Sequence, residues 1–146
     1  MTRDIIHAVE IATEPKAVFD AIATKSGLAS FWTADVEGDE AEGGTLTFGF
    51  PQAPIRMPIV VSKLDAPTEI IWDCPAGYPF WEGTRVSWSL ATGDGGTKVV
   101  FRHAGFPDEQ PEFDFGSVGL TWGLIVARLK EVVEAGVANP FFGQKR

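Results

Sequence analysis

The sequence predicts an α+β fold in which a curved antiparallel sheet of seven strands wraps around a long C-terminal helix, with two short helices between the first two strands. Three observations predict it. Apolar residues recur mostly at every second position from Thr33 to Ala104, which is typical of half-buried strands. The links between these stretches have the length of hairpin turns, so neighbouring strands should run antiparallel. After Ala104 the apolar spacing becomes that of one helix, which can cover the apolar face of the sheet.

The N-terminal third combines one strand signal with two helix signals. We expect the first strand over residues 5–11, where apolar residues share one face. A short helix should follow over residues 14–24, because Thr13 is a typical N-cap residue and Pro15 suits the first helical turn. A second helical turn is expected at about 26–30.

Six further strands are expected before the final helix, separated by turn-forming glycine, proline and aspartate residues. Their expected ranges are 33–37, 45–50, 57–61, 70–74, 82–90 and 99–103. The long helix should cover about Phe115–Ala135, since its apolar residues form one helical stripe and Gly136 follows at the usual end position. The stripe consists of Val118, Trp122, Ile125, Val126, Leu129, Val132 and Val133.

Composition excludes several classes of protein. Lys and Arg number 12 against 20 Asp and Glu, a formal net charge of −8, which argues against nucleic acid and against anionic membrane surfaces as partners. The single cysteine, Cys74, excludes an intramolecular disulfide and a thiolate zinc cluster. Because the two histidines, His7 and His103, lie about a hundred residues apart in sequence, we expect no metal site. We also expect no cofactor. From the length of the chain we expect one domain over residues 1–146. Because the sequence has neither a signal peptide nor an apolar run long enough to span a membrane, we expect the protein in the cytoplasm.

Large rings on the inward side of the strands are the most informative feature. The chain has 11 Phe and 5 Trp. Any one of these rings could simply be part of a packed core. Alternatively, because a curved sheet and one helix do not close completely, the rings could line a cleft, the common build of a small-molecule site. The expected lining residues are Trp32, Phe48, Phe50, Trp72, Glu82, Trp88, Phe101, His103, Trp122 and Val126.

His103 and Glu82 are the polar members of this set. Each could anchor the polar end of a ligand or act as an acid–base group. Equally, Glu82 could lie at an exposed strand start and His103 could bond a loop carbonyl. A nucleophilic Cys74–His103 pair is not expected, since a meander separates their strands by about two strand spacings, roughly 9–10 Å. We therefore assign no catalytic residue.

Several segments resemble one known superfamily in order and spacing. They are Val9–Ile22, Leu28–Thr33, Thr97–Phe106, Gly119–Trp122 and Leu129–Gly136. The chain resembles the SRPBCC (START-like, helix-grip) superfamily and, within it, the C-terminal domain family of the activator of heat-shock protein 90 ATPase. The resemblance implies a helix-grip fold with a ligand cavity between sheet and helix. The superfamily includes lipid carriers, polyketide cyclases, hormone receptors and co-chaperones, so fold alone does not decide function.

Three functions follow from these observations. The preferred hypothesis is a binding protein for a small apolar, aromatic or lipid-like ligand. The second is a cyclase- or dehydratase-type enzyme using the same cavity, which should show two or more convergent titratable groups, whereas only His103 is credible as an inward one. The third is a stress-related co-chaperone-like module, which an exposed apolar patch would favour. A protein partner or a homodimer is left open.

Overall fold

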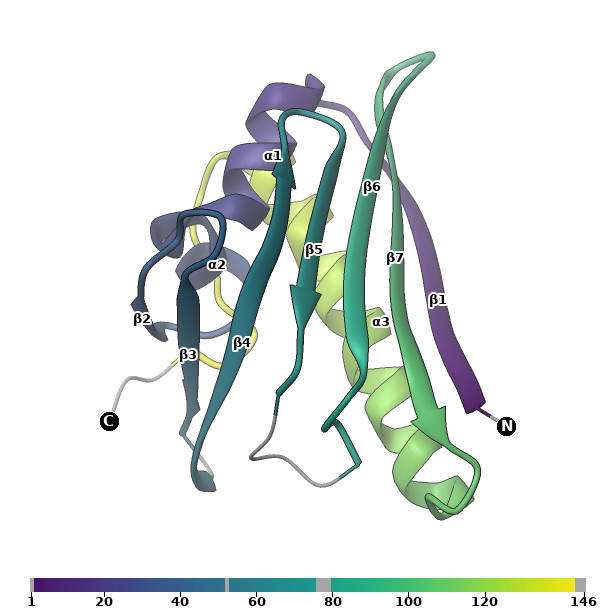
Figure 1. Cartoon of the computed structure of the whole chain (residues 1–146). Helices are drawn as coiled ribbons and strands as arrows, with labels where there is room; N and C mark the ends of the chain where they lie inside the picture. Colours follow the sequence, from purple (N-terminus) through teal and green to yellow (C-terminus); the bar gives the residue numbers. More distant parts are fainter. Residues whose placement is uncertain (1, 52, 76–79, 144–146) are drawn as a thin grey trace.

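An antiparallel sheet forms the framework of the molecule (Figure 1). The computed structural model describes residues 2–51, 53–75 and 80–143, and within them seven strands pair in the spatial order β1-β7-β6-β5-β4-β3-β2. The strands are β1 (Thr2–Ile11), β2 (Asp35–Gly38), β3 (Thr45–Phe50), β4 (Ala53–Asp65), β5 (Glu69–Asp73), β6 (Arg85–Gly93) and β7 (Gly96–Pro107). The predicted α+β class and antiparallel sheet are confirmed.

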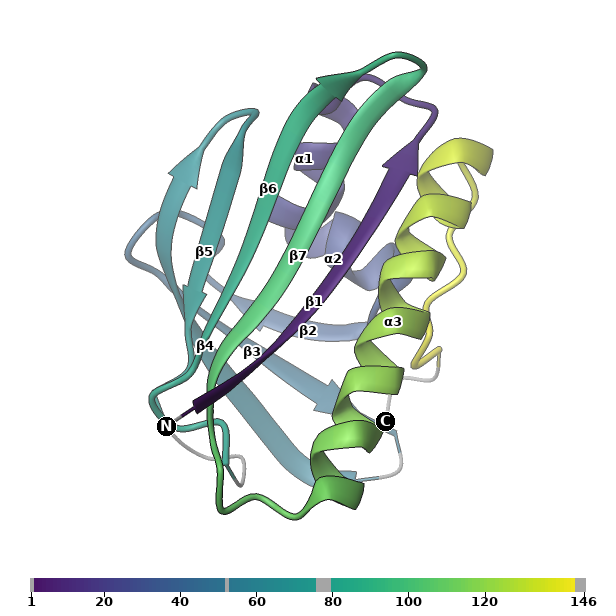
Figure 2. The same cartoon turned by 90° about the vertical axis from the view of Figure 1, so that its right-hand side faces the viewer.

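In the part of the chain that the structure describes, three helices lie on one side of this sheet. Figure 2 shows the sheet curving around α3 (Glu112–Ala135), with α1 (Pro15–Ala23) and α2 (Lys25–Phe31) on the same side. Among the described residues, no helix combines the length and the apolar character needed to cross a membrane.

The ends of the helices follow local chemistry. The N-cap of α1 is Glu14 and not the predicted Thr13; its side chain makes no cap hydrogen bond, and the fixed backbone of Pro15 opens the helix instead. Thr24 ends α1 and caps α2 by accepting a hydrogen bond from the Gly27 amide. The turn between these helices is tight, because a Cβ on Gly27 would lie 2.3 Å from the Ala21 carbonyl oxygen.

Two strands and the long helix differ in extent from their predicted ranges. β4 spans 13 residues, more than the predicted 57–61, and a register shift between Val61 and Lys63 interrupts its regular pairing. β6 begins at Arg85, three residues after the predicted start, because residues 80–83 form a turn. α3 begins at Glu112 rather than Phe115.

The core lies between the concave face of the sheet and the inner face of α3. The predicted helical stripe is confirmed, although Val118 and Val133 are only half-buried. Its fully buried members are Trp122, Ile125, Val126, Leu129 and Val132. The edge strand β1 also contacts α3 closely, since His7 Nε2 donates to the Gly119 carbonyl at 2.9 Å.

Candidate functional site

A partly open pocket of about 260 Å³ lies between the N-terminal half of α3 and the sheet, where β3 ends and β4 begins. Its walls come from the end of α2, from β3 and β4, from the turn before β6, from α3 and from the segment after α3. The lining residues are Trp32, Phe50, Met57, Trp81, Ser117, Val118, Thr121, Trp122, Ile125 and Phe142.

Three tryptophans, Trp32, Trp81 and Trp122, line the pocket. Trp122 projects inward from α3, with its ring centroid 5.1 Å from that of Trp32 and 6.0 Å from that of Trp81. The Trp81 and Trp122 rings are nearly parallel, at 25°. All three side chains are buried, so the part of the pocket that they line is apolar and largely desolvated.

The polar character of the pocket is low. Ser117 and Thr121, one turn apart on α3, contribute its hydroxyl groups, and Thr121 Oγ1 also donates to the Ser117 carbonyl at 2.9 Å. Within the described part of the chain, no charged side chain lines the pocket. A charged ligand group would lose its hydration there without gaining an ionic partner, which is costly.

A buried hydrogen-bond chain holds two of the pocket tryptophans. Trp122 Nε1 donates to His103 Nδ1 at 3.1 Å, and His103 Nε2 lies 2.8 Å from Thr84 Oγ1. Thr84 Oγ1 in turn donates to the Trp81 carbonyl at 2.5 Å. Because an indole N–H only donates, His103 Nδ1 must accept, and the neutral imidazole carries its proton on Nε2. Both ring nitrogens are thus used inside the protein.

The electrostatics of this chain disfavour acid–base work at neutral pH. Burial lowers the pKa of His103 to about 3, so the imidazole is neutral. Burial also raises the pKa of the Cys74 thiol, which keeps it protonated and weakly nucleophilic. Among the described residues, no three His, Cys, Asp or Glu side chains come together as a metal site would require.

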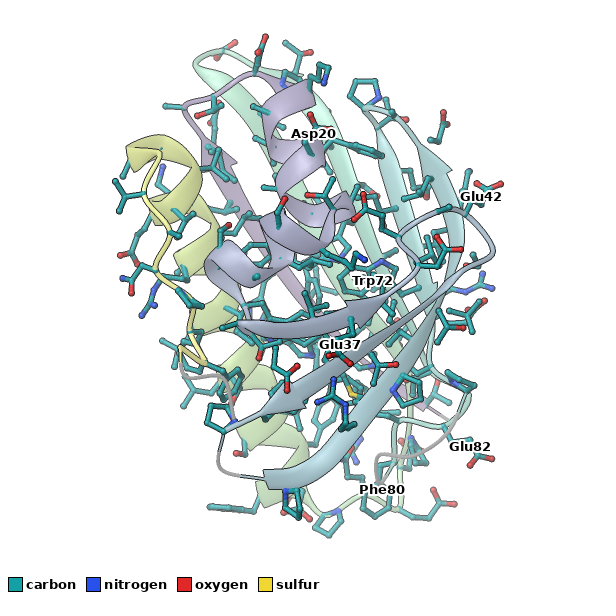
Figure 3. The ribbon with its side chains drawn as sticks, turned by 90° about the vertical axis from the view of Figure 1, so that its left-hand side faces the viewer. Asp20, Glu37, Glu42, Trp72, Phe80 and Glu82 are labelled. Atoms are coloured by element: carbon teal, nitrogen blue, oxygen red, sulfur yellow. The ribbon has the colours of Figure 1, made fainter. Side chains whose placement is uncertain are left out.

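The structure distributes the sequence-predicted residues over three positions. Trp32, Phe50 and Trp122 line the pocket. The second group is buried in the surrounding core, at most 3% exposed, and comprises Phe48, Trp72, Trp88, Phe101, His103 and Val126. Glu82 is exposed, and the expectation that it points inward is wrong because the chain is still in a turn there. In Figure 3, Trp72 lies in the middle of the molecule, whereas Glu82 projects outward at its lower edge.

Sequence reasoning missed seven lining residues. Val118 and Ile125 belonged to the predicted helical stripe and could have been included from it. Ser117 and Thr121 are their polar neighbours on the same helix, and no apolar pattern marks them. Trp81 lies in a turn, where strand parity does not apply, and Phe142 follows the end of the last predicted element. The remaining missed residue is Met57, which alternates with Ile59 in β4.

The sequence also matches a known family. The model of the family described as "Activator of Hsp90 ATPase homolog 1-like protein" matches residues 12–134. No curated protein sequence matches the chain significantly.

Solved structures show the same architecture. The Aha1 dimer from Colwellia psychrerythraea, determined in solution, is 27% identical with a TM-score of 0.81, over 92% of this chain and 98% of that one. SSP2350 from Staphylococcus saprophyticus is 19% identical with a TM-score of 0.77, over 94% and 96% of the two chains. DynU16, from the dynemicin biosynthetic locus, is 16% identical with a TM-score of 0.77, over 94% of this chain and 49% of that one. At such identities the last two show the fold alone.

Proposed function

Since the chain belongs to the family of activator of Hsp90 ATPase homologue 1-like proteins, we propose that it is a binding protein for a small, uncharged, apolar or aromatic ligand. The observation that carries the proposal is the pocket of about 260 Å³ with walls of stacked rings and no charged lining residue among those described. An apolar cavity of about 150 Å³ holds benzene. This pocket therefore suits a ligand of one or two fused rings, or a short acyl chain.

Binding would be driven by the removal of the apolar ligand surface from water. Flat apolar ligands can stack on Trp32, Trp81 and Trp122, which are already desolvated and held in place. The Ser117 and Thr121 hydroxyls can orient a single polar substituent such as a phenol or a carbonyl.

The internal use of His103 favours binding over catalysis. A cyclase or dehydratase needs convergent titratable groups that reach the substrate. Both nitrogens of His103 are hydrogen-bonded to protein atoms, and Glu82 is turned to solvent. Neither residue offers a proton to a molecule in the pocket.

Isothermal titration with 2-naphthol, a neutral two-ring probe, tests the proposal. We expect binding by the parent chain and a loss of about tenfold or more in affinity for Val118→Trp, which places a large ring in the pocket, since a blocked cavity forfeits the burial that drives binding. The matched control is Val100→Trp, at an exposed position of β7 outside the pocket lining, which should bind as the parent does. Equal affinity of the parent and Val118→Trp would show that the probe binds elsewhere.

A second property concerns assembly: we propose that the chain self-associates through the outer face of α3. Phe113, Leu120 and Leu124 form one stripe there and are 84%, 66% and 47% exposed. Their spacing of 7 and 4 residues places them on the side of α3 opposite its buried residues. The related Aha1 protein from Colwellia psychrerythraea is a dimer. The occupant proposed for this stripe is a second copy of the chain, and the mass of the protein in solution tests it.

A further inference from the structure

The segment that follows α3 returns to the pocket. Gly136 adopts the left-handed conformation, at φ 69°, which lets the chain reverse after the helix. Residues 137–143, called the C-terminal strap, then run back along α3 (Figure 2). Three strap amides donate to the carbonyls of residues 30–32, and the Phe142 carbonyl accepts from the Ala34 amide, at 2.7–3.1 Å. These bonds fix the strap beside the end of α2.

The two adjacent phenylalanine rings of the strap, Phe141 and Phe142, lie against different parts of the protein. Phe142 lines the pocket, with its ring centroid 5.0 Å from that of Phe50 in an edge-to-face arrangement. Phe141 instead faces the Arg128 guanidinium, which lies 5.7 Å from its ring centroid. Arg128 Nη1 also donates to the Asn139 carbonyl at 2.7 Å, so this side of the strap is clamped to α3.

We propose that Phe142 is the specificity-determining residue of the pocket and sets the size of the ligand that it admits. This inference rests on the proposed binding function. The other aromatic walls are constrained by the sheet, by α3 or by the His103 hydrogen-bond chain, and changing them disturbs the core. Phe142 is held in place by its backbone, and its half-buried ring lines the pocket while packing edge-to-face against Phe50 and against Phe141, at centroid distances of 5.0 and 4.9 Å. Shortening this side chain therefore enlarges the pocket while the strap keeps its hydrogen bonds.

The test compares two neutral probes, 2-naphthol with two rings and N-phenyl-1-naphthylamine with three, titrated into the full chain. For Phe142→Ala we expect the ratio of affinities, larger probe over smaller, to rise by about tenfold. Phe142→Leu should give an intermediate ratio. The matched control is Phe141→Ala, which removes the neighbouring ring outside the pocket and should leave the ratio as in the parent. Circular dichroism and thermal unfolding establish that each variant is folded.

Three outcomes separate this inference from the function on which it rests. A parent chain that binds 2-naphthol, with the same affinity ratio in Phe142→Ala, overturns the role of Phe142 alone. An equal change in Phe141→Ala also overturns it, because the effect would then belong to the strap as a whole. A parent chain that binds neither probe overturns the proposed function together with the inference. If Phe142→Ala does not fold, Phe142→Leu and Phe141→Leu provide the same comparison.

Discussion

The buried imidazole of His103 makes the stability of the protein depend on pH. In the folded chain its pKa is lowered to about 3, whereas an unfolded histidine has a pKa near 6.5. Below pH 6.5 the unfolded chain therefore takes up a proton that the folded chain does not bind. Above pH 6.5 this histidine does not make the free energy of unfolding depend on pH. As the pH falls from 6.5 toward 3, the free energy of unfolding declines by about 1.4 kcal/mol per pH unit.

His103→Phe tests this account. At pH 7 the variant should be less stable by about 1–3 kcal/mol, because Trp122 Nε1 loses its acceptor and Thr84 Oγ1 loses a donor. The variant has no imidazole at this position to titrate, so the stability gap should narrow by about 2 kcal/mol between pH 6.5 and pH 5. Urea denaturation followed by tryptophan fluorescence at both pH values measures it. A gap that stays constant would mean that His103 is protonated in the folded chain.

Strand parity predicted which single residues point inward, but not what they bond. It placed Trp72, Trp88, Phe101 and His103 correctly in the interior. It could not show that Trp122, from a helix 19 residues further along the chain, satisfies His103 Nδ1. The inward orientation predicted for Glu82 is wrong for a related reason. The alternating pattern of the sequence begins at residue 82, whereas the hydrogen-bonded strand β6 begins only at Arg85.

At the scale of elements, two glycines in helices should respond to alanine in opposite directions. A Cβ on Gly27 would lie 2.3 Å from a backbone oxygen of α1, so Gly27→Ala must push α1 and α2 apart and should destabilise the protein by about 1–3 kcal/mol. A Cβ on Gly116, in α3, meets no atom within 4 Å. Gly116→Ala should therefore stabilise the protein by about 0.5–1 kcal/mol through helix propensity. Urea denaturation of both variants checks the signs, and a stabilised Gly27→Ala would contradict the tight helix contact.

The elements were largely predictable because their patterns are local. The 3.6-residue period of α3 and the turn-bounded alternation of β3 are properties of short stretches of sequence, and β3 was predicted at its observed bounds. The pocket was only partly predictable, because it forms where elements end. Trp81 lies in a turn and Phe142 in the strap, and only the tertiary packing brings them to Trp122.

At the scale of the whole molecule, the net charge disfavours association of two copies, whereas the apolar outer face of α3 favours it. Two copies with a net charge of −8 repel, and salt screens that repulsion over about 10 Å at 0.1 M. Burying the stripe of Phe113, Leu120 and Leu124 favours association. If the stripe is the interface, dimerisation should strengthen as salt is raised from low to moderate concentration, because the apolar contribution is not screened.

Leu120→Lys separates these two contributions. The added cation changes the net charge from −8 to −7, so long-range repulsion falls, yet a lysine in the centre of an apolar interface must be desolvated. We expect Leu120→Lys to be monomeric at concentrations where the parent chain dimerises. Val100→Lys, at an apolar position of β7 that is 41% exposed, makes the same change of charge away from α3 and should dimerise as the parent does or more strongly. Sedimentation equilibrium measures both. Dimers of equal strength in the parent and in Leu120→Lys would exclude the outer face of α3, because only an interface elsewhere leaves the added charge in water.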